Sequence, residues 1–440
     1  MIQVAQILFI LSVLVILHEF GHYIAAKIFK VRVEKFYLFM DAGFSLFKKK
    51  IGETEWGVGW LPIGGYVKLS GMVDESMDLE QMEQEPQPYE FRYKPAWQRL
   101  IIMLGGIIVN ILLAWFIFTI LYSTVGKKTV LTDKFQKNGL SFTDTGYKVG
   151  FKEGDKIVSV DGILQPNFNR MVIDMLLGEE VIVDRNGQET KIILDDNAKK
   201  LILGNEGKNF IIPRVTAQVD SVMVNSNAAL AGLKKGDVIV GVNNTPTPFY
   251  TDFKKALDPI KNDSLGLKIN RTGTEIILRA KTNSDGKLGI VLKDIETSSF
   301  LETQKMGLGD AFVAAVKEST QLIVYNVKQL KLIVRPKTEA YKQVRSPIGI
   351  ARMLPDTWNW EFIWSFTALF SIGLAFMNIL PIPGLDGGHA LFTIVEMVTG
   401  KTLSPKAMGY VQTGGMIFLL SLMALTFGKD IYQLVIDKFL

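Results

Sequence analysis

The stretch that decides the fold is IQVAQILFILSVLVILHEFGHYIAA, residues 2–26. It is almost continuously apolar up to residue 17, and it is longer than the roughly 20 residues that a helix needs to cross a bilayer. Two histidines and a glutamate then follow, at a depth where polar groups are costly. We therefore expect a membrane-spanning helix that carries a functional site. No basic region precedes it, which favours an uncleaved anchor over a signal peptide.

Three further stretches are apolar and long enough to span a membrane: residues 100–125, 362–380 and 408–427. The chain of 440 residues is 48% hydrophobic, with a mean hydropathy of +0.22, which is rich for a soluble protein. A formal charge of +5, dispersed along the chain, gives no reason to expect nucleic acid. We expect a polytopic α-helical membrane protein with four spans. Because cysteine is absent, any metal must be held by His, Asp, Glu or Asn.

The basic residues beside the spans predict the orientation. They gather at positions 27–35, 92–99 and 401–406, and basic flanks are typical of cytoplasmic loops. By alternation, both termini and the segment 126–361 lie outside the cytoplasm. Tryptophans at 358, 360 and 364 suit the outer membrane–water interface.

The external segment contains an internal repeat. GFKEGDKIVSVDG (150–162) and GLKKGDVIVGVNN (232–244) agree at seven of thirteen positions and start 82 residues apart. Both resemble the GLxxGDxIxxVNG signature of PDZ domains, which implies two tandem PDZ-like α+β domains at 127–213 and 214–300. Such domains can add a peptide as a strand, or the pair can act as a steric shield, and the sequence leaves both open. Residues 301–361 are expected to form an external amphipathic helical segment. The two remaining parts are membrane regions, the first at 1–126 and the second at 362–440.

Chemistry is expected where two distant motifs meet. His18 and His22 are four residues apart, so a helix projects both imidazoles from one face, with Glu19 beside them. A second acid, Asp386, lies in FMNILPIPGLDGGHA (376–390), directly after the third span. An uncompensated acid in the middle of a membrane helix costs about 2.5–3.5 kcal/mol. Two acids and two imidazoles at one depth therefore predict a bound cation.

One Zn²⁺ ion satisfies this set. Catalytic zinc keeps three protein ligands and an open position for water, and His18, His22 and Asp386 would supply the three ligands. His389 is the alternative third ligand. Glu19 would act as the general base, taking a proton from water and passing it to the leaving amine. The predicted reaction is peptide-bond hydrolysis.

HEFGH in the first span, together with NILPIPGLDGG in the third, resembles the site-2 protease family of intramembrane zinc metalloproteases, whose patterns are HExxH and NxxPxxxLDG. The resemblance implies the same three ligands and base, and it points to Asn378 as a contact of the substrate or transition state. A buried Asn that ties two helices together is the alternative. GGIIVN (105–110) resembles the family's GPxxN stretch but lacks the proline, and RSPIGIA (345–351) lacks the glycine expected before its proline.

GWLPIGGYVKLSGM (59–72) resembles the glycine-rich, membrane-entering β-hairpin of that family. A helical substrate must be stretched before hydrolysis, and a sheet edge stabilises the stretched form by strand addition. The predicted hairpin covers residues 55–69, and an ordinary cytoplasmic hairpin is the alternative. The residues predicted to bind substrate are Gly57, Gly59, Gly64 and Gly65 here, with Asn378, Pro381 and Pro383 near the point where the prolines should unwind the third span.

We therefore expect an intramembrane zinc endopeptidase that acts in regulated intramembrane proteolysis and cuts membrane-embedded segments near the cytoplasmic face. The resemblance implies a multi-pass protein of the cell inner membrane with periplasmic PDZ-like domains. It also implies transmembrane substrates of the anti-sigma factor type and remnant signal peptides. Two other functions would fit parts of the pattern: a membrane-anchored PDZ scaffold without catalysis, and an ion-coupled transporter. The oligomeric state cannot be predicted from the sequence.

Overall fold

The computed structural model describes residues 2–62, 64–72, 85–204, 210–293 and 300–439. The chain forms two compact units. The helical unit comprises residues 1–127, 305–331 and 343–440, and the β-rich unit comprises residues 128–304 and 332–342. The segment 301–361, expected as one piece, is thus divided between the two units.

The helical unit contains the four expected spans. Within the described residues, four helices are long and apolar enough to cross a membrane. They are α1 (Ile2–Ile28), α2 (Ala96–Thr124), α11 (Trp360–Ile379) and α13 (Pro405–Phe439). The other helices of the unit are η2 (Phe91–Tyr93), α9 (Leu308–Ile333), α10 (Pro347–Ala351) and α12 (Asp386–Thr399). The chain is therefore a membrane protein, as its composition predicts.

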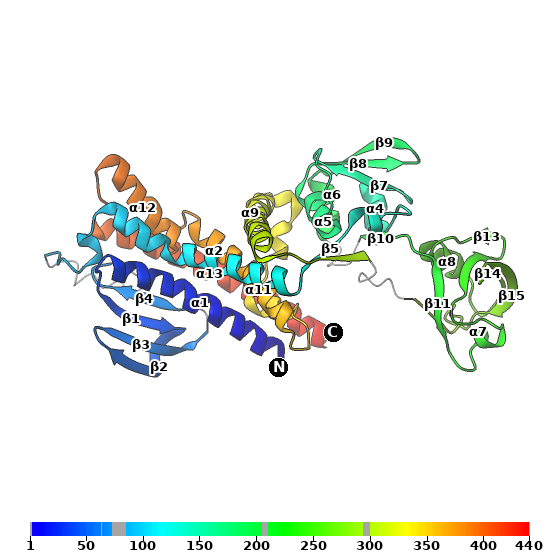
Figure 1. The fold of residues 1–440 in the computed structure, drawn as a ribbon, viewed down its shortest axis with the longest axis horizontal. Helices are drawn as coiled ribbons and strands as arrows, with labels where there is room; N and C mark the ends of the chain where they lie inside the picture. The colour runs from blue at the N-terminus through cyan, green and yellow to red at the C-terminus, as the bar shows by residue number, and fades with distance from the viewer. Residues whose placement is uncertain (1, 63, 73–84, 205–209, 294–299, 440) are drawn as a thin grey trace. The chain divides into compact units, whose positions relative to one another are not determined.

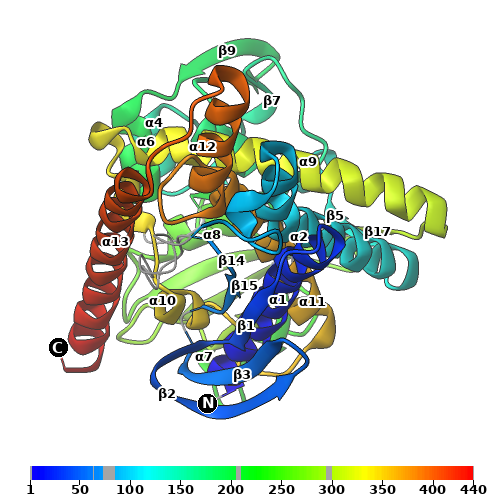
Figure 2. The ribbon, with the colours of Figure 1, turned by 90° about the vertical axis from the view of Figure 1, so that its left-hand side faces the viewer.

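Helix α2 is the centre of the helical unit, where it packs against α1, α11 and α12 (Figure 1). Helices α1 and α2 touch through their backbones, because a Cβ atom at Gly21 would lie 2.3 Å from the carbonyl oxygen of Gly105. Small residues commonly permit such close approach of membrane helices. Helix α13 lies at one side of the unit and is mostly exposed (Figure 2). The close α1–α2 crossing matters because it lies at the level of the histidine pair.

One end of the spans is marked by aromatic rings and by helix α9. Phe9 of α1 lies 5.7–6.2 Å from the ring centroids of Trp358, Trp360 and Trp364. Helix α9 packs against the spans, since Ala315 belongs to a buried cluster with residues of α2 and α11. The amphipathic character of α9 is therefore used at least partly for packing against other helices.

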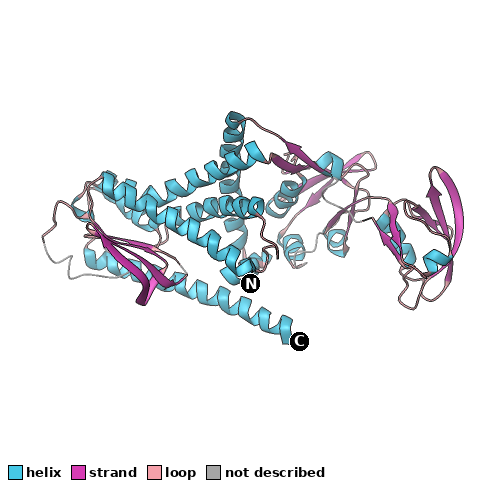
Figure 3. Ribbon diagram, turned by 60° about the horizontal axis from the view of Figure 1, so that its bottom comes forward, coloured by secondary structure: helices cyan, strands magenta, loops and turns pink. Residues whose placement is uncertain are grey.

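A four-stranded sheet lies beside the helices (Figure 3). Its strands are β1 (Val33–Leu38), β2 (Met40–Ile51), β3 (Thr54–Leu61) and β4 (Tyr66–Leu69), in the order β2-β3-β1-β4. The hairpin expected over 55–69 is therefore wrong in its pairing. Strands β3 and β4 both pair with β1, and the hairpin is formed by β2 and β3. The earlier strand β1 lies between β3 and β4. The alternation of apolar and polar residues within 55–69 contains no information about this insertion. Residue 63 lies outside the described residues.

The β-rich unit contains two separate hydrophobic cores, one built from residues between 130 and 211 and one from residues between 217 and 288. Around the first core lie β5 (Lys127–Val130), α3 (Thr132–Phe135), β6 (Leu140–Phe142), α4 (Asp144–Val149), β7 (Lys156–Val160), α5 (Phe168–Leu177), β8 (Glu180–Arg185), β9 (Gln188–Ile193), α6 (Asp196–Leu203) and β10 (Ile211–Pro213). Strands β7, β8 and β9 form one antiparallel sheet, and β6 pairs with β10.

The second core lies against a larger sheet in the order β15-β14-β12-β11-β16, with β13 paired to β12. Its elements are β11 (Ala217–Val222), α7 (Asn227–Leu230), β12 (Val238–Val242), β13 (Thr245–Pro246), α8 (Tyr250–Leu257), β14 (Ser264–Arg271), β15 (Thr274–Lys281) and β16 (Ile290–Leu292). The unit is completed by β17 (Leu301–Gln304), which pairs with β5, and by η4 (Pro336–Thr338) and η5 (Ala340–Gln343).

The two copies of the repeat make the same buried ion pair. Asp155 accepts hydrogen bonds from Arg185, and Asp237 accepts hydrogen bonds from Arg271, each at 2.7–2.8 Å. Each aspartate also accepts a bond from the backbone N–H three residues earlier, at 2.8 Å. Both aspartates are buried. The Gly-Asp dipeptide shared by the two sequence copies therefore lies in a turn, and an arginine of the same copy stabilises that turn by binding the aspartate.

We expect Asp237→Asn to destabilise the domain that contains the second copy of the repeat. The hydrogen-bonded Arg271 guanidinium lowers the pKa of Asp237, so the ionised form stabilises the fold above the unfolded pKa of about 3.9 and that stability is lost on further acidification. Hydrogen bonds to a charged group contribute roughly 1.5–3 kcal/mol. Hydrogen exchange of the full chain at neutral pH should therefore be at least tenfold faster in β11 and β12. Asp220→Asn, which removes an exposed ion pair with Lys235, is the control and should change little. Equal exchange in both variants would contradict the assignment.

Candidate metal centre

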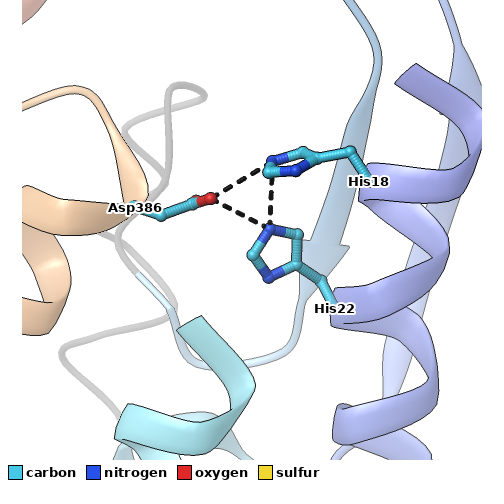
Figure 4. Close-up of side chains that lie close together, drawn as sticks. All are labelled: His18, His22 and Asp386. Carbon is cyan, nitrogen blue, oxygen red and sulfur yellow. Dashed lines mark hydrogen bonds and ion pairs between the residues drawn. The ribbon is translucent and has the colours of Figure 1, made fainter. Parts of the chain in front are cut away.

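Helix α1 presents the two histidines on one face. His18 and His22 are both buried, and their Nε2 atoms lie 3.4 Å apart (Figure 4). The four-residue spacing brings the two rings one turn apart on the helix, as predicted. The pair points toward the start of α12, away from the body of its own helix.

Asp386 completes a triangle with the histidine pair. Its Oδ2 atom lies 3.1 Å from His18 Nε2 and 3.2 Å from His22 Nε2 (Figure 4). Asp386 is the first residue of α12 and follows a non-helical loop that begins where α11 ends at Ile379. Proline at 381 and 383 explains this break, because proline cannot continue a helix without losing a backbone hydrogen bond. The structure thus brings together residues that are more than 360 positions apart.

The last span holds the loop that carries Asp386. The backbone N–H of Gly384 donates to Oε1 of Gln412 in α13, at 2.7 Å. Gly415 packs directly on Pro383, because a Cβ atom at Gly415 would lie 1.9 Å from the carbonyl oxygen of Pro383. His389, the alternative third ligand, has its Nε2 atom 2.8 Å from Nε2 of Gln412. His389 therefore faces α13, and the third corner of the triangle belongs to Asp386.

The chemistry of the three atoms fits a zinc ion. Nδ1 of His22 lies 2.8 Å from the carbonyl oxygen of Ile102, so Nδ1 carries the proton of a neutral ring and Nε2 presents a lone pair. Oδ2 of Asp386 is buried without a hydrogen-bond partner among the described residues. Zinc binds nitrogen and oxygen at about 2.0–2.1 Å in tetrahedral geometry, which separates neighbouring ligand atoms by about 3.3–3.4 Å. The observed separations of 3.1, 3.2 and 3.4 Å lie within about 0.2 Å of this spacing.

Within the described residues, His18, His22 and Asp386 form the group of His, Asp and Glu side chains whose ligand atoms converge within 4.8 Å. Glu19 stands next to this group on α1 and is half-buried. The chain before β4 approaches Glu19, since a Cβ atom at Gly65 would lie 3.4 Å from Glu19 Cγ and 2.6 Å from a methyl group of Val15. A Cβ atom at Gly64 would meet nothing within 4 Å among the residues that the structure describes. Gly65 therefore lies beside the candidate base, and Gly64 is the residue before it in the chain.

Gly57 and Gly59 lie elsewhere. Both belong to β3, which pairs with β2 on one side and β1 on the other, so its backbone has no free edge. A Cβ atom at Gly57 would lie 2.3 Å from the ring of Tyr37, and one at Gly59 would lie 2.2 Å from the carbonyl oxygen of Met40. These glycines make room for neighbouring strands.

Asn378 lies next to the triangle. Its Nδ2 atom is 3.0 Å from His18 Nε2, and the side chain is half-buried in the last turn of α11. A carboxamide in this place is within reach of a group bound at the three converging atoms. Pro381 is exposed and Pro383 is half-buried in the loop that follows.

Sequence reasoning missed the groups on neighbouring helices that contact the two histidines and the loop before Asp386. The carbonyl oxygen of Ile102 lies against His22, and Asn110 of α2 has its Nδ2 atom 3.1 Å from His18 Nδ1. Gln412 of α13 accepts from the N–H of Gly384 in that loop. A polar residue within an otherwise apolar span is a usable signal for Asn110 and Gln412. No sequence signal marks a particular backbone carbonyl.

Comparison with known proteins gives consistent results. A family model described as Peptidase family M50 matches residues 6–422. A protein of Vibrio cholerae serotype O1, named as a zinc metalloprotease, is 28% identical over 454 residues, which cover 96% of this chain and 97% of that protein. The regulator of sigma-E protease RseP of Escherichia coli is 27% identical over 461 residues, covering 98% and 99% of the two chains. The regulator of sigma E protease of Haemophilus influenzae is 26% identical over 449 residues, covering 96% and 97%.

Proposed function

Because the chain belongs to peptidase family M50 and is a membrane-bound zinc metalloprotease of the site-2 type, we propose that His18, His22 and Asp386 hold its zinc ion and that Glu19 is its general base. The observation that carries this proposal is the convergence of three lone-pair atoms at 3.1–3.4 Å, one of them a buried carboxylate oxygen. Family membership makes the chain an enzyme, so the scaffold and transporter hypotheses are not pursued.

Zinc, when bound, supplies a Lewis acid that lowers the pKa of water and polarises a carbonyl group. The residues of the chain supply the rest. The Glu19 carboxylate takes the proton of the attacking water and passes it to the nitrogen of the leaving amine. Asn378 donates an N–H to the carbonyl oxygen on which negative charge develops. Its 3.0 Å distance from His18 Nε2 supports this role.

We propose that substrate binds in extended form along β4. The sheet has two edge strands, β2 and β4, and β4 is the edge that contacts α1, which carries the histidines. Gly64 and Gly65 directly precede β4, and Gly65 lies beside Glu19, which supports their role as substrate contacts. The loop containing Pro381 and Pro383 would then bound the substrate on the side of Asp386. Strand addition would expose the scissile carbonyl, which is hidden by hydrogen bonds in a helical substrate.

For the β-rich unit we propose two PDZ-like domains at 127–213 and 214–300. The two hydrophobic cores and the matching Asp155 and Asp237 ion pairs support a duplicated domain. The five-part division at 1–126, 127–213, 214–300, 301–361 and 362–440 remains our proposal for the chain. We further propose that this unit is periplasmic and that it acts as a size filter against bulky external domains or as a peptide-binding module. The cluster of tryptophans around Phe9 supports an outer interface at that end of the spans.

The proposed substrates are transmembrane proteins of the anti-sigma factor type and remnant signal peptides, cut near the cytoplasmic side of the cell inner membrane. The support is that relatives from Escherichia coli and Haemophilus influenzae are named regulators of sigma-E protease. The proposed process is regulated intramembrane proteolysis.

Metal removal tests the proposed function. The full chain, reconstituted in liposomes with a model transmembrane substrate, should lose cleavage to background with ortho-phenanthroline and regain it when zinc is added back in stoichiometric amount. Ortho-phenanthroline chelates zinc, and its non-chelating meta isomer controls for effects on the membrane. Cleavage that survives the chelator, with zinc shown by elemental analysis to be gone, would refute a mechanism based on zinc.

A further inference from the structure

Asn110 is a buried polar side chain that the proposed mechanism does not use. It lies in the middle of the span α2 and is 0% exposed. Its Nδ2 atom is 3.1 Å from His18 Nδ1, while its Oδ1 atom is buried and has no partner among the residues that the structure describes. A buried acceptor without a partner is costly, because it has given up its hydrogen bonds to water and gained none in the protein. A carboxamide at this place in an apolar helix therefore needs a hydrogen-bond donor.

The ring of His18 offers that donor. Its Nε2 atom faces Asp386 Oδ2 at 3.1 Å and His22 Nε2 at 3.4 Å, so Nε2 is the lone-pair side of the ring. A neutral imidazole then carries its proton on Nδ1, and this N–H can donate only to an acceptor. The two ends of a carboxamide have nearly the same shape, so its other rotamer places Oδ1 where Nδ2 lies. In that rotamer the Asn110 oxygen accepts from His18, and its unsatisfied acceptor disappears.

Resting on the metal assignment in the proposed function, we propose that Asn110 is a positioning residue: its side-chain oxygen accepts the Nδ1–H of His18, which fixes the tautomer and the ring orientation that keep Nε2 facing the metal. The carbonyl oxygen of Ile102 makes the matching contact with His22 Nδ1 at 2.8 Å. Helix α2 thus contacts the Nδ1 atom of both histidines, on the side of each ring opposite Nε2. It does so by a backbone group at His22 and by a side chain at His18. Partners of this kind typically account for 10–100-fold in metal affinity.

The test measures zinc affinity of the full chain in detergent micelles by competition with a chromophoric chelator. Asn110→Leu keeps the approximate size of the side chain and removes the acceptor, so zinc should bind 10–100-fold more weakly. Asn110→Asp keeps an acceptor oxygen and should stay within about threefold of the unchanged chain. Cleavage by Asn110→Leu should recover in part at saturating zinc, whereas a collapsed site would not recover.

Ser371→Ala is the matched control. The Ser371 hydroxyl is buried and donates to the backbone carbonyl of Asn110 at 2.7 Å, so its loss disturbs α2 at the same residue without removing a contact of His18. Zinc affinity should stay unchanged. Two results would overturn the proposal: wild-type zinc affinity in Asn110→Leu, or an equal loss in Asn110→Asp and Asn110→Leu.

A further variant separates this inference from the proposed function. His18→Ala should abolish stoichiometric zinc binding if His18 is a ligand. Zinc retained by His18→Ala would refute the metal assignment itself. Zinc lost from His18→Ala but retained with full affinity by Asn110→Leu would leave the metal assignment standing and refute only the role of Asn110.

Discussion

Glu19→Gln should reduce cleavage of a transmembrane substrate by about 10²–10⁴-fold, the range of general acid–base catalysis. The substitution keeps the size and the hydrogen-bonding capacity of the side chain but removes the basic oxygen. Glu19 contributes none of the three atoms that converge at 3.1–3.4 Å, so zinc content should remain close to one ion per chain. The expected result is an inactive protein that still contains zinc, measured by cleavage in liposomes and by elemental analysis.

Glu396→Gln is the control for removing a carboxylate elsewhere in the helical unit. Glu396 is half-buried in α12 and forms an ion pair with Arg99 of α2. Its loss should leave the chemical step unchanged. Near-normal cleavage by Glu19→Gln would show that another group accepts the proton and would refute the assigned base.

Gly106→Ala should disrupt the metal centre through one added methyl group. A Cβ atom at Gly106 would lie 2.5 Å from both His18 Cε1 and His22 Nε2. Separations under about 3 Å are well inside carbon–carbon contact, which is optimal at about 3.5–4.0 Å. Both rings are also held from other sides, by Ile102, Asn110 and Asp386, so neither can simply move away. Overpacking of this kind typically costs about 1–3 kcal/mol.

If that cost falls on the metal-bound arrangement, zinc affinity should fall by about 5–150-fold, since each 1.4 kcal/mol is tenfold in an equilibrium constant. Competition with a chelator measures the change, and cleavage at limiting zinc should fall with it. Gly373→Ala in α11 is the matched control, because a Cβ atom there meets nothing within 4 Å among the described residues. Unchanged zinc affinity in Gly106→Ala would mean that the two rings are not fixed as the structure shows them.

The unsuccessful prediction about the sheet shows the limit of local patterns. Residues 55–69 have the alternation and glycines of a hairpin, but pairing is a property of two strands and register. Strand β1, residues 33–38, inserts between β3 and β4, and nothing within 55–69 records this. The same insertion places Gly57 and Gly59 in an interior strand, whereas Gly65 lies beside α1.

The sequence by itself determined the four spans, because hydrophobic length is a property of contiguous residues. It also determined that His18 and His22 share one helical face, because the helical period relates residues four apart. Only the tertiary structure decided that Asp386 rather than His389 completes the triangle. It also decided that Ile102 and Asn110 contact the two histidines and that Gln412 holds the loop before Asp386. These contacts join residues from 28 to more than 360 positions apart. Which side chains meet there depends on how closely α1 approaches α2 and α13 approaches the loop before Asp386. Glycines allow both approaches, at Gly21 with Gly105 and at Gly415 with Pro383, and no local period records them.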